Sequence, residues 1–234
     1  IRDQPRSRGL GDVYKRQVLD VDSTLIEDEV IELLADAAGT REEVAAVTER
    51  AMRGELDFAE SLHARVATLA GLPTSVLHDA RRRVRYTPGV GRLAATVRAT
   101  GGTVAVVSGG FQEIVDQLVA PLAIDHAEAN RLGTDGGQLT GTVAGAVVDA
   151  DRKQAFLTEL AEQLGIPQAR TVAIGDGAND LRMIAAAGVG IAFCAKPVVR
   201  EAAPCSLRTR RLDLVLALLG IGEDAVSDVP DPRA

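Results

Sequence analysis

Two aspartates two positions apart, Asp20 and Asp22, follow the short apolar pair Val18-Leu19. Side chains alternate between the two faces of an extended chain, so both carboxylates are predicted to project on one side while Val21 points into the core. Two carboxylates about 4 Å apart repel by roughly 4 kcal/mol at an effective dielectric near 20. The pair therefore predicts a nucleophile beside an acid, with a cation at one carboxylate and a proton on the other. Mg²⁺ fits, because it takes hard oxygen ligands and often joins one or two carboxylates to a phosphate.

Two further polar clusters also follow apolar runs. The cluster 175–180 (GDGAND) follows Thr171–Ile174, and Ser108-Gly109-Gly110 follows Val104–Val107. The second cluster is predicted to open a helix from residue 111 to about 118, whose N-terminal N–H groups and partial positive charge favour phosphate binding. Taken alone, each cluster could be a solvated turn or a helix cap. Open parallel α/β sheets build their sites at the carboxyl ends of the strands, so one shared site accounts for all of the clusters.

The remaining pattern indicates the elements that position this site. Apolar residues recur at near four-residue spacing at Phe58, Leu62, Val66 and Leu69, which predicts helices between about 27 and 85. The stretch 130–149, turning at 135–137, predicts an antiparallel hairpin, and helices are expected at 152–165 and 178–187. We therefore predict an α/β fold, with a parallel sheet covered by helices on both faces, a small helical cap and an appended β-hairpin. The expected division is a catalytic core at 18–26 and 87–222, the helical insertion at 27–86, and a flexible C-terminal tail at 223–234.

The first 17 residues do not fit this scheme. They carry five arginines or lysines, show neither helical nor strand periodicity, and lack the apolar segment of a signal peptide. We interpret residues 1–17 as an atypical tail that is not native to the fold. The first strand is expected to be short, because only Val18-Leu19 precedes Asp20.

The amino-acid composition argues against some kinds of binding partner and cellular location for this chain. The chain has 234 residues, of which 46% are hydrophobic and 25% charged, and a formal net charge of −7. An acidic chain with 3% aromatic residues and no Trp is poorly suited to broad contact with nucleic acid. No apolar run approaches the ~18 residues of a membrane span. Only two cysteines, Cys194 and Cys205, are present, so no disulfide framework is indicated and a reducing, cytoplasmic compartment is expected. We expect either a monomer or a homodimer.

The clusters carry a family resemblance. Residues 20–24 (DVDST), 108–110 (SGG), Lys153 and 175–180 resemble the four motifs of the haloacid-dehalogenase superfamily of phosphotransferases. Within it, further stretches are similar to the phosphoserine phosphatase family, and the resemblance extends over roughly 18–219. These stretches are 27–29 (EDE), 51–52 (AM) through Phe58, 61–62 (SL), 65–66 (RV), 129–132 (ANRL) and 191–197 (IAFCAKP).

The resemblance implies a Mg²⁺-dependent phosphomonoesterase that hydrolyses O-phosphoserine through an aspartyl phosphate, the last step of serine synthesis. Asp20 would be the nucleophile and Asp22 the general acid and base. Mg²⁺ would be held by the Asp20 carboxylate, the Asp22 main-chain carbonyl and Asp176, with Asp180 in the supporting shell. The implied substrate-binding residues are Ser108, the Gly109 N–H and Lys153 for the phosphate, Glu29 for the ammonium, Arg65 for the carboxylate, and Asn179.

Alternatives remain open at this point. Singly, Lys153 and Arg65 could be solvated helix charges and Glu29 could simply favour a helix N-terminus, but their joint spacing favours function. The same fold could instead transfer phosphate to another hydroxyl, such as that of homoserine. A non-enzymatic phospho-acceptor switch is a third possibility. Asp22 argues against it, because a switch must keep its acyl phosphate whereas this residue would help to remove it.

Overall fold

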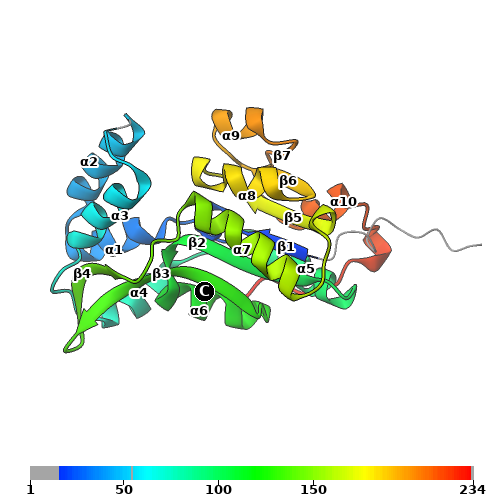
Figure 1. The fold of residues 1–234 in the computed structure, drawn as a ribbon. Helices are drawn as coiled ribbons and strands as arrows, with labels where there is room; N and C mark the ends of the chain where they lie inside the picture. Colours follow the sequence, from blue (N-terminus) through cyan, green and yellow to red (C-terminus); the bar gives the residue numbers. More distant parts are fainter. Residues whose placement is uncertain (1–15, 54, 233–234) are drawn as a thin grey trace, which may run out of the picture.

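The computed structural model describes residues 16–232 with the exception of residue 54, so most of the predicted atypical tail lies outside the described residues. A seven-stranded sheet forms the centre, in the order β4-β3-β2-β1-β5-β6-β7 (Figure 1). All neighbouring strands are parallel except β3 and β4, which form an antiparallel pair. The strands are β1 (Arg16–Leu19), β2 (Thr103–Phe111), β3 (His126–Asp135), β4 (Gln138–Ala144), β5 (Thr171–Gly175), β6 (Val189–Phe193) and β7 (Cys205–Leu207).

The central strand β1 is short, as expected, but it begins before Val18. Arg16 pairs with Thr103 of β2 and with Thr171 of β5, and Gln17 pairs with the next residue of each neighbour. Backbone pairing on both sides extends the strand without requiring apolar side chains. Residues 16 and 17 therefore belong to the sheet rather than to the predicted tail.

Helices cover both faces of the sheet, which confirms the predicted fold class. Val18, Ala105 and Ala173 face a cluster formed by α7, α8 and α9, and α7 crosses in front of the strands in Figure 1. Leu19 and Val106 point to the opposite face, where α5, α6 and α10 pack. These helices are α5 (Val90–Ala99), α6 (Gln112–Val119), α7 (Ala150–Gln163), α8 (Leu181–Ala186), α9 (Pro197–Ala202) and α10 (Leu214–Leu218). Short 3-10 turns lie at Ala120–Leu122, Gln168–Arg170, Ala178–Asp180 and Glu223–Ala225.

Four helices form an insertion between β1 and α5. They are α1 (Val30–Ala38), α2 (Arg41–Met52), α3 (Phe58–Ala67) and α4 (Ser75–Arg83). The chain leaves and re-enters the core side by side, because Ile26 and Tyr86 form an isolated bridge and the Thr87 N–H donates to the Leu25 carbonyl at 3.0 Å. The insertion is thus joined to the core by two adjacent chain segments, at residues 25–26 and 86–87. None of the helices in the described part of the chain is long and apolar enough to cross a membrane.

The helix predicted from residue 111 to about 118 is present as α6, which spans Gln112–Val119. The strand before it is longer than its apolar run indicates, because β2 continues through Phe111 and includes Ser108, Gly109 and Gly110 near its end. The pairing of β2 with β3 shifts register between Ser108 and Phe111, and this irregularity keeps the segment extended. The predicted hairpin is present, although its first strand starts earlier, at His126, and pairs with β2 before it pairs with β4.

The C-terminal segment, predicted to be a flexible tail, packs against the core in its described part, residues 223–232. The Asp231 carboxylate accepts hydrogen bonds from the N–H groups of Gly89 and Gly91, each at 2.8 Å, at the start of α5. The Ser227 N–H donates to the Thr96 hydroxyl at 2.8 Å. The first N–H groups of a helix lack partners within the helix, so α5 offers a binding place that a carboxylate fills.

Candidate active site

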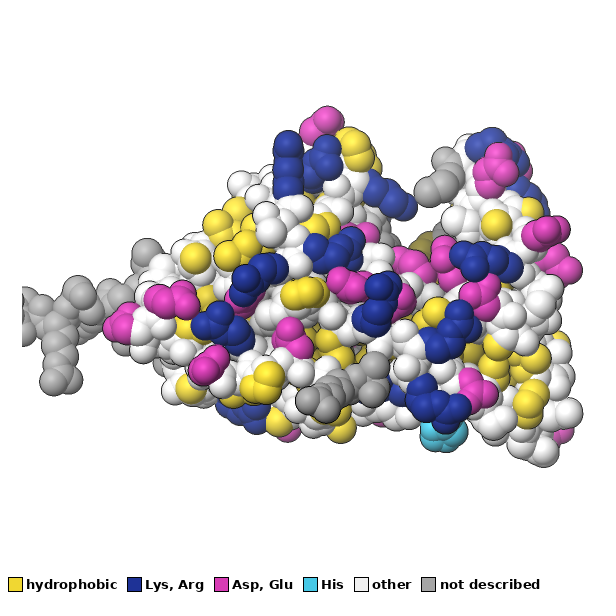
Figure 2. All heavy atoms as spheres, turned by 180° about the vertical axis from the view of Figure 1, so that it is seen from behind, with side chains coloured by type: hydrophobic (Ala, Val, Ile, Leu, Met, Phe, Trp, Pro, Cys, Tyr) yellow, Lys and Arg dark blue, Asp and Glu magenta, His cyan; other side chains and the backbone are white. Residues whose placement is uncertain are grey.

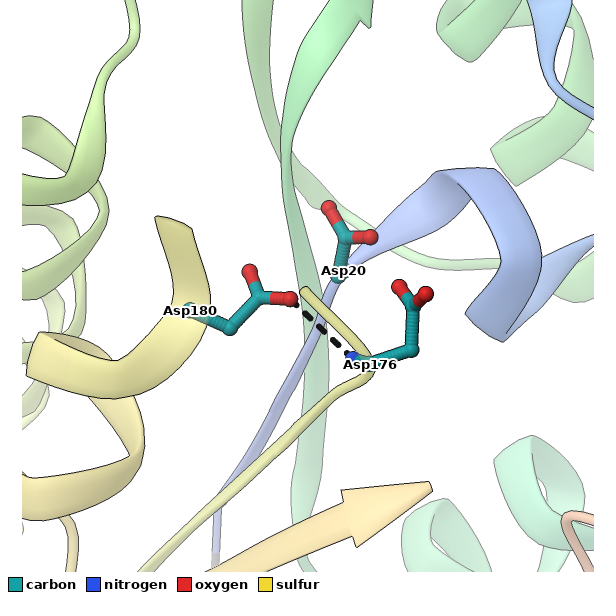
Figure 3. A group of neighbouring side chains, drawn as sticks. All are labelled: Asp20, Asp176 and Asp180. Carbon is teal, nitrogen blue, oxygen red and sulfur yellow. Dashed lines mark hydrogen bonds between the residues drawn. The ribbon is translucent and has the colours of Figure 1, made fainter. Parts of the chain in front are cut away.

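Three carboxylates converge at the carboxyl ends of β1 and β5. Asp20 directly follows β1, Asp176 directly follows β5, and Asp180 ends the short turn after it (Figure 3). One oxygen from each lies within 4.8 Å of the others. Asp180 is fixed by the N–H groups of Asp176 at 3.1 Å and Gly177 at 3.0 Å. A side chain at Gly175 would meet the Asp180 carboxyl carbon at 2.4 Å, so the turn requires a glycine there.

Lys153 of α7 lies beneath these carboxylates. It is fully buried, and its Nζ donates to Asp20 Oδ1 at 2.5 Å and to Asp180 Oδ1 at 2.7 Å. Burial alone would lower the pKa of Lys153, but attraction to Asp180 and Asp20 outweighs it and the pKa is raised. Lys153 is therefore a permanent positive charge at neutral pH, and the surface-lysine alternative does not hold.

The trio still carries excess negative charge. Burial, followed by repulsion from Asp180, raises the pKa of Asp20 well above its usual value. The same two causes raise the pKa of Asp176 to about 7. One ammonium cannot neutralise three carboxylates, and their hard oxygen atoms are the donors that divalent cations prefer. The residues present therefore fit a divalent metal ion.

Asp22 lies on the irregular turn Val21–Leu25 and lines the same cleft. Its Oδ1 accepts a hydrogen bond from the Val30 N–H at 3.4 Å. Burial, followed by repulsion from Glu29, raises the pKa of Asp22 to about 8. A carboxyl with this pKa keeps its proton at neutral pH, which is the property needed in a general acid.

The end of β2, at residues 108–110, faces Asp22. Ser108 is buried, and its hydroxyl accepts a hydrogen bond from the Gly110 N–H at 2.8 Å. A Cβ at Gly110 would lie 3.0 Å from both Asp22 Oδ2 and Ser108 Oγ, so the glycine allows these two groups to approach. Buried Asn130 anchors this strand end by donating to the Gly109 carbonyl at 2.9 Å. The sequence pattern assigns no role to Asn130, although a buried amide in a strand usually has a hydrogen-bond partner of this kind.

The helical insertion supplies the opposite wall. Arg65 of α3 donates from Nε to the Ser61 carbonyl at 3.1 Å. Burial lowers the pKa of Arg65, and the negative charges of Glu29 and Asp22 counteract this. Phe58 reaches across the cleft, because its ring carbon would lie 2.7 Å from a Cβ at Gly109. The insertion thus contacts the end of β2 as well as facing the acidic trio.

These walls enclose a cleft of about 440 Å³. Figure 2, the view from behind, shows it as a notch between the insertion on the right and the α9 side on the left, with acidic side chains at its floor. Lys153 and Asp180 lie beneath the floor. Lys196, at the start of α9, also lines the cleft, and the sequence pattern assigns it no role. The predicted site residues that line the cleft are Asp20, Asp22, Glu29, Arg65, Ser108, Gly109, Asp176 and Asn179.

Comparison with known proteins gives consistent matches. The model of the family described as haloacid dehalogenase-like hydrolase matches residues 18–185. The phosphoserine phosphatase of Streptomyces coelicolor is 56% identical over 209 residues, 89% of this chain and 51% of that protein. Phosphoserine phosphatase SerB2 of Mycobacterium tuberculosis is 51% identical over 216 residues, 92% of this chain and 53% of that protein.

The chain therefore spans about half the length of these curated relatives. A solved structure described as a phospho-aspartyl intermediate analogue of phosphoserine phosphatase superimposes with a TM-score of 0.82 at 41% identity. That match covers 88% of this chain and 98% of the other. The described fold is thus similar to nearly the whole of that solved chain.

Proposed function

The chain belongs to the haloacid dehalogenase-like hydrolase family, and on this basis we propose that it is a phosphoserine phosphatase, which hydrolyses O-phospho-L-serine to L-serine and phosphate. The observation that carries the proposal is the pairing of two different walls in one cleft. One wall holds carboxylates at strand ends, with Lys153 beneath them. The other holds one carboxylate, Glu29, and one guanidinium, Arg65, which complement the ammonium and the carboxylate of an amino acid.

In the proposed mechanism, a carboxylate oxygen of Asp20 attacks the phosphorus and the bond to the serine oxygen breaks. Asp22 gives its proton to the departing oxygen, and its raised pKa supports this role. The serine leaves, and Asp22, now ionised, takes a proton from the water that attacks the aspartyl phosphate. This second step releases phosphate and restores both carboxyl groups.

We assign phosphate binding to residues 108 and 109, near the end of β2, and to Lys153. The Ser108 hydroxyl, the Gly109 N–H and the Lys153 ammonium would hold the equatorial oxygens, on which charge accumulates in the transition state. Lys153 contacts the carboxylate of the nucleophile itself, so its charge lies where the new bond forms. Asn179 lines the cleft close to Gly109, and we propose that it contacts the substrate.

We propose Mg²⁺ as the divalent metal, held by the carboxylates of Asp20 and Asp176 and the main-chain carbonyl of Asp22. Asp180 would support this set through its hydrogen bonds to the N–H groups of Asp176 and Gly177. When bound, the ion would supply positive charge that offsets the carboxylates and the phosphoryl oxygens. The cytoplasmic location, the place in serine synthesis and the monomeric or homodimeric state remain predictions.

Matched substrates test the amino-acid wall. O-phosphoethanolamine is O-phosphoserine without its carboxylate. Arg65→Ala is therefore expected to lower activity on O-phosphoserine and to leave activity on O-phosphoethanolamine unchanged. Loss of a charge-assisted contact worth roughly 2–4 kcal/mol lowers kcat/KM for O-phosphoserine about 30- to 1,000-fold. Arg82→Ala is the control, because Arg82 is an exposed arginine of the same insertion outside the cleft.

Equal losses on both substrates would show that Arg65 serves the packing of the insertion, and the proposed substrate would lose its support. Assays with Mg²⁺ and with a chelator test the metal in the same series. Phosphate release that requires an added alcohol acceptor would identify a phosphotransferase instead. Absence of catalytic release from every phosphomonoester would favour a phospho-acceptor switch.

A further inference from the structure

Glu29 does not act as the cap of the helix that it precedes. It occupies the N-cap position of α1, yet its carboxylate makes no hydrogen bond to the backbone N–H groups of the first turn. Its Oε1 instead accepts a hydrogen bond from the Ser23 hydroxyl at 2.7 Å. Oε2 has no hydrogen-bond partner among the residues that the structure describes. One oxygen of the carboxylate is therefore held by Ser23, and the other is available to a ligand in the cleft that Glu29 lines.

Ser23 holds this position with an unusual backbone. Its φ is +57°, in the left-handed region that non-glycine residues rarely adopt. The same residue is fixed on both sides, because its N–H donates to the Asp28 carbonyl at 3.4 Å and its carbonyl accepts from Arg210 Nη1 at 3.3 Å. A side chain used only to cap the turn would bond a backbone N–H, whereas the Ser23 hydroxyl points to Glu29.

Arg210 comes from the segment between β7 and α10, far from Ser23 in sequence. Its guanidinium is exposed and makes its one hydrogen bond, within the described part of the chain, to the Ser23 carbonyl. A charged donor on the Ser23 carbonyl stabilises the turn that holds Ser23. The contact connects the rim of the core on the α9 side to the loop that carries both Ser23 and Glu29.

We propose that Ser23 is a positioning residue for Glu29, that Arg210 supports it, and that this arrangement selects phosphomonoesters bearing an ammonium group. The inference rests on the proposed function, in which Glu29 receives the substrate ammonium. A preorganised carboxylate binds a cation more tightly than one that must be ordered on binding, because its conformational entropy has already been lost. Ser23 thus acts on specificity without touching the phosphoryl group.

The test compares O-phosphoserine with 3-phosphonooxypropanoate, which lacks only the amino group. Ser23→Ala removes the hydroxyl and keeps a side chain in the left-handed turn, whereas Ser23→Gly removes it and relieves the strain. Both variants are expected to reduce the preference for the amine about tenfold, the size of one hydrogen bond to a charged group. In a Glu29→Ala background, Ser23→Ala is expected to cause no further loss of preference.

Arg210→Gln is expected to reduce the same preference by a smaller factor. Arg208→Gln is its matched control, because Arg208 is an exposed arginine of the same segment without a side-chain partner among the described residues. Equal effects of the two substitutions would remove Arg210 from the proposal. Loss of preference in Ser23→Ala but not in Ser23→Gly would mean that the turn matters and the hydroxyl does not.

The outcomes separate this inference from the proposed function. A wild-type protein that hydrolyses both substrates equally would overturn the proposed substrate and the ammonium role of Glu29 together. A wild-type preference for the amine that survives both Ser23 substitutions would overturn only the role of Ser23. Double-mutant unfolding of Ser23→Ala and Glu29→Ala gives a readout without substrate, and strictly additive losses there would also reject the coupling.

Discussion

Replacing Lys153 with methionine removes the ammonium that lies among the buried carboxylates while keeping an unbranched side chain of similar length. Lys153 is fully buried, and its Nζ contacts both Asp20 and Asp180. Removing one partner of a buried ion pair costs about 3–5 kcal/mol, because the remaining charge is uncompensated. For a domain of this size each kcal/mol shifts Tm by about 2–4 °C, so the metal-free variant is expected to unfold about 6–20 °C below wild type.

The loss should depend on pH in a defined direction. The folded-state pKa of Asp20 and of Asp176 is already raised above the usual range, to about 7 for Asp176. Acids with a raised folded-state pKa cost stability once the pH exceeds their unfolded value near 4, and the cost grows until the folded pKa is passed. Without Lys153 the pKa of Asp20 rises further. The deficit of the variant is therefore expected to be largest at pH 8 and to shrink as the pH falls below about 7.

Scanning calorimetry or thermal circular dichroism measures this, with and without Mg²⁺. Mg²⁺ is expected to raise the Tm of Lys153→Met more than that of wild type, because the acidic group then lacks the buried ammonium of Lys153. Lys196→Met is the control, since it removes an exposed lysine at the same cleft. A Tm for Lys153→Met within about 2 °C of the control at pH 8, or a deficit that grows on acidification, would refute this reasoning.

Four further outcomes follow from the contacts described above. Asp20→Asn should abolish turnover with Tm retained, and a phosphoryl group trapped on any other residue would contradict this. Asp22→Asn should still be phosphorylated by an aryl phosphate, whose good leaving group needs no acid, but hydrolyse the intermediate about 10²–10⁴-fold more slowly in single-turnover kinetics. Because the protonated form of Asp22 is lost above its pKa of about 8, wild-type activity on O-phosphoserine should fall above that pH, and more steeply than activity on the aryl phosphate. Asp231→Asn should lower Tm by about 2–4 °C, since it weakens a charge-assisted cap worth about 1 kcal/mol on the N–H groups of Gly89 and Gly91, and an unchanged Tm would contradict it.

The sheet and the location of the site could be predicted from the sequence, because both depend on the local pattern of apolar and polar residues. Apolar runs ending in polar clusters predict strands whose carboxyl ends meet, and Asp20, Asp176 and Asp180 do converge. The continuation of β2 through Ser108 to Phe111 was not predicted, because the irregular pairing with β3 depends on contact between strands and leaves no local signature. The start of β1 at Arg16, before the apolar pair Val18-Leu19, was missed for the same reason.

Other features depend on contacts between distant segments. Asp231 reaches Gly89 across 142 positions, and nothing near the C-terminus indicates which helix it will cap. Ser23 adopts a left-handed conformation that sequence normally reveals through glycine. Its contact with Glu29 therefore could not be predicted, although both residues lie in a stretch whose resemblance to a known family was evident.

The hairpin and the helical insertion share an edge. The loop between α3 and α4 pairs with β4, since Gly71 N–H donates to the Leu139 carbonyl at 2.8 Å, Leu139 N–H to Leu72 at 2.8 Å, and Thr74 N–H to Gly137 at 2.9 Å. An exposed edge strand is a template for pairing with other chains, and here the insertion covers it. Removing the insertion, or replacing it with one that lacks these contacts, would thus expose β4 and promote aggregation, so the two elements should be exchanged together in chimaeras. Amide hydrogen exchange at Gly71, Leu139 and Thr74 would report in a single measurement whether the insertion has swung away from the sheet.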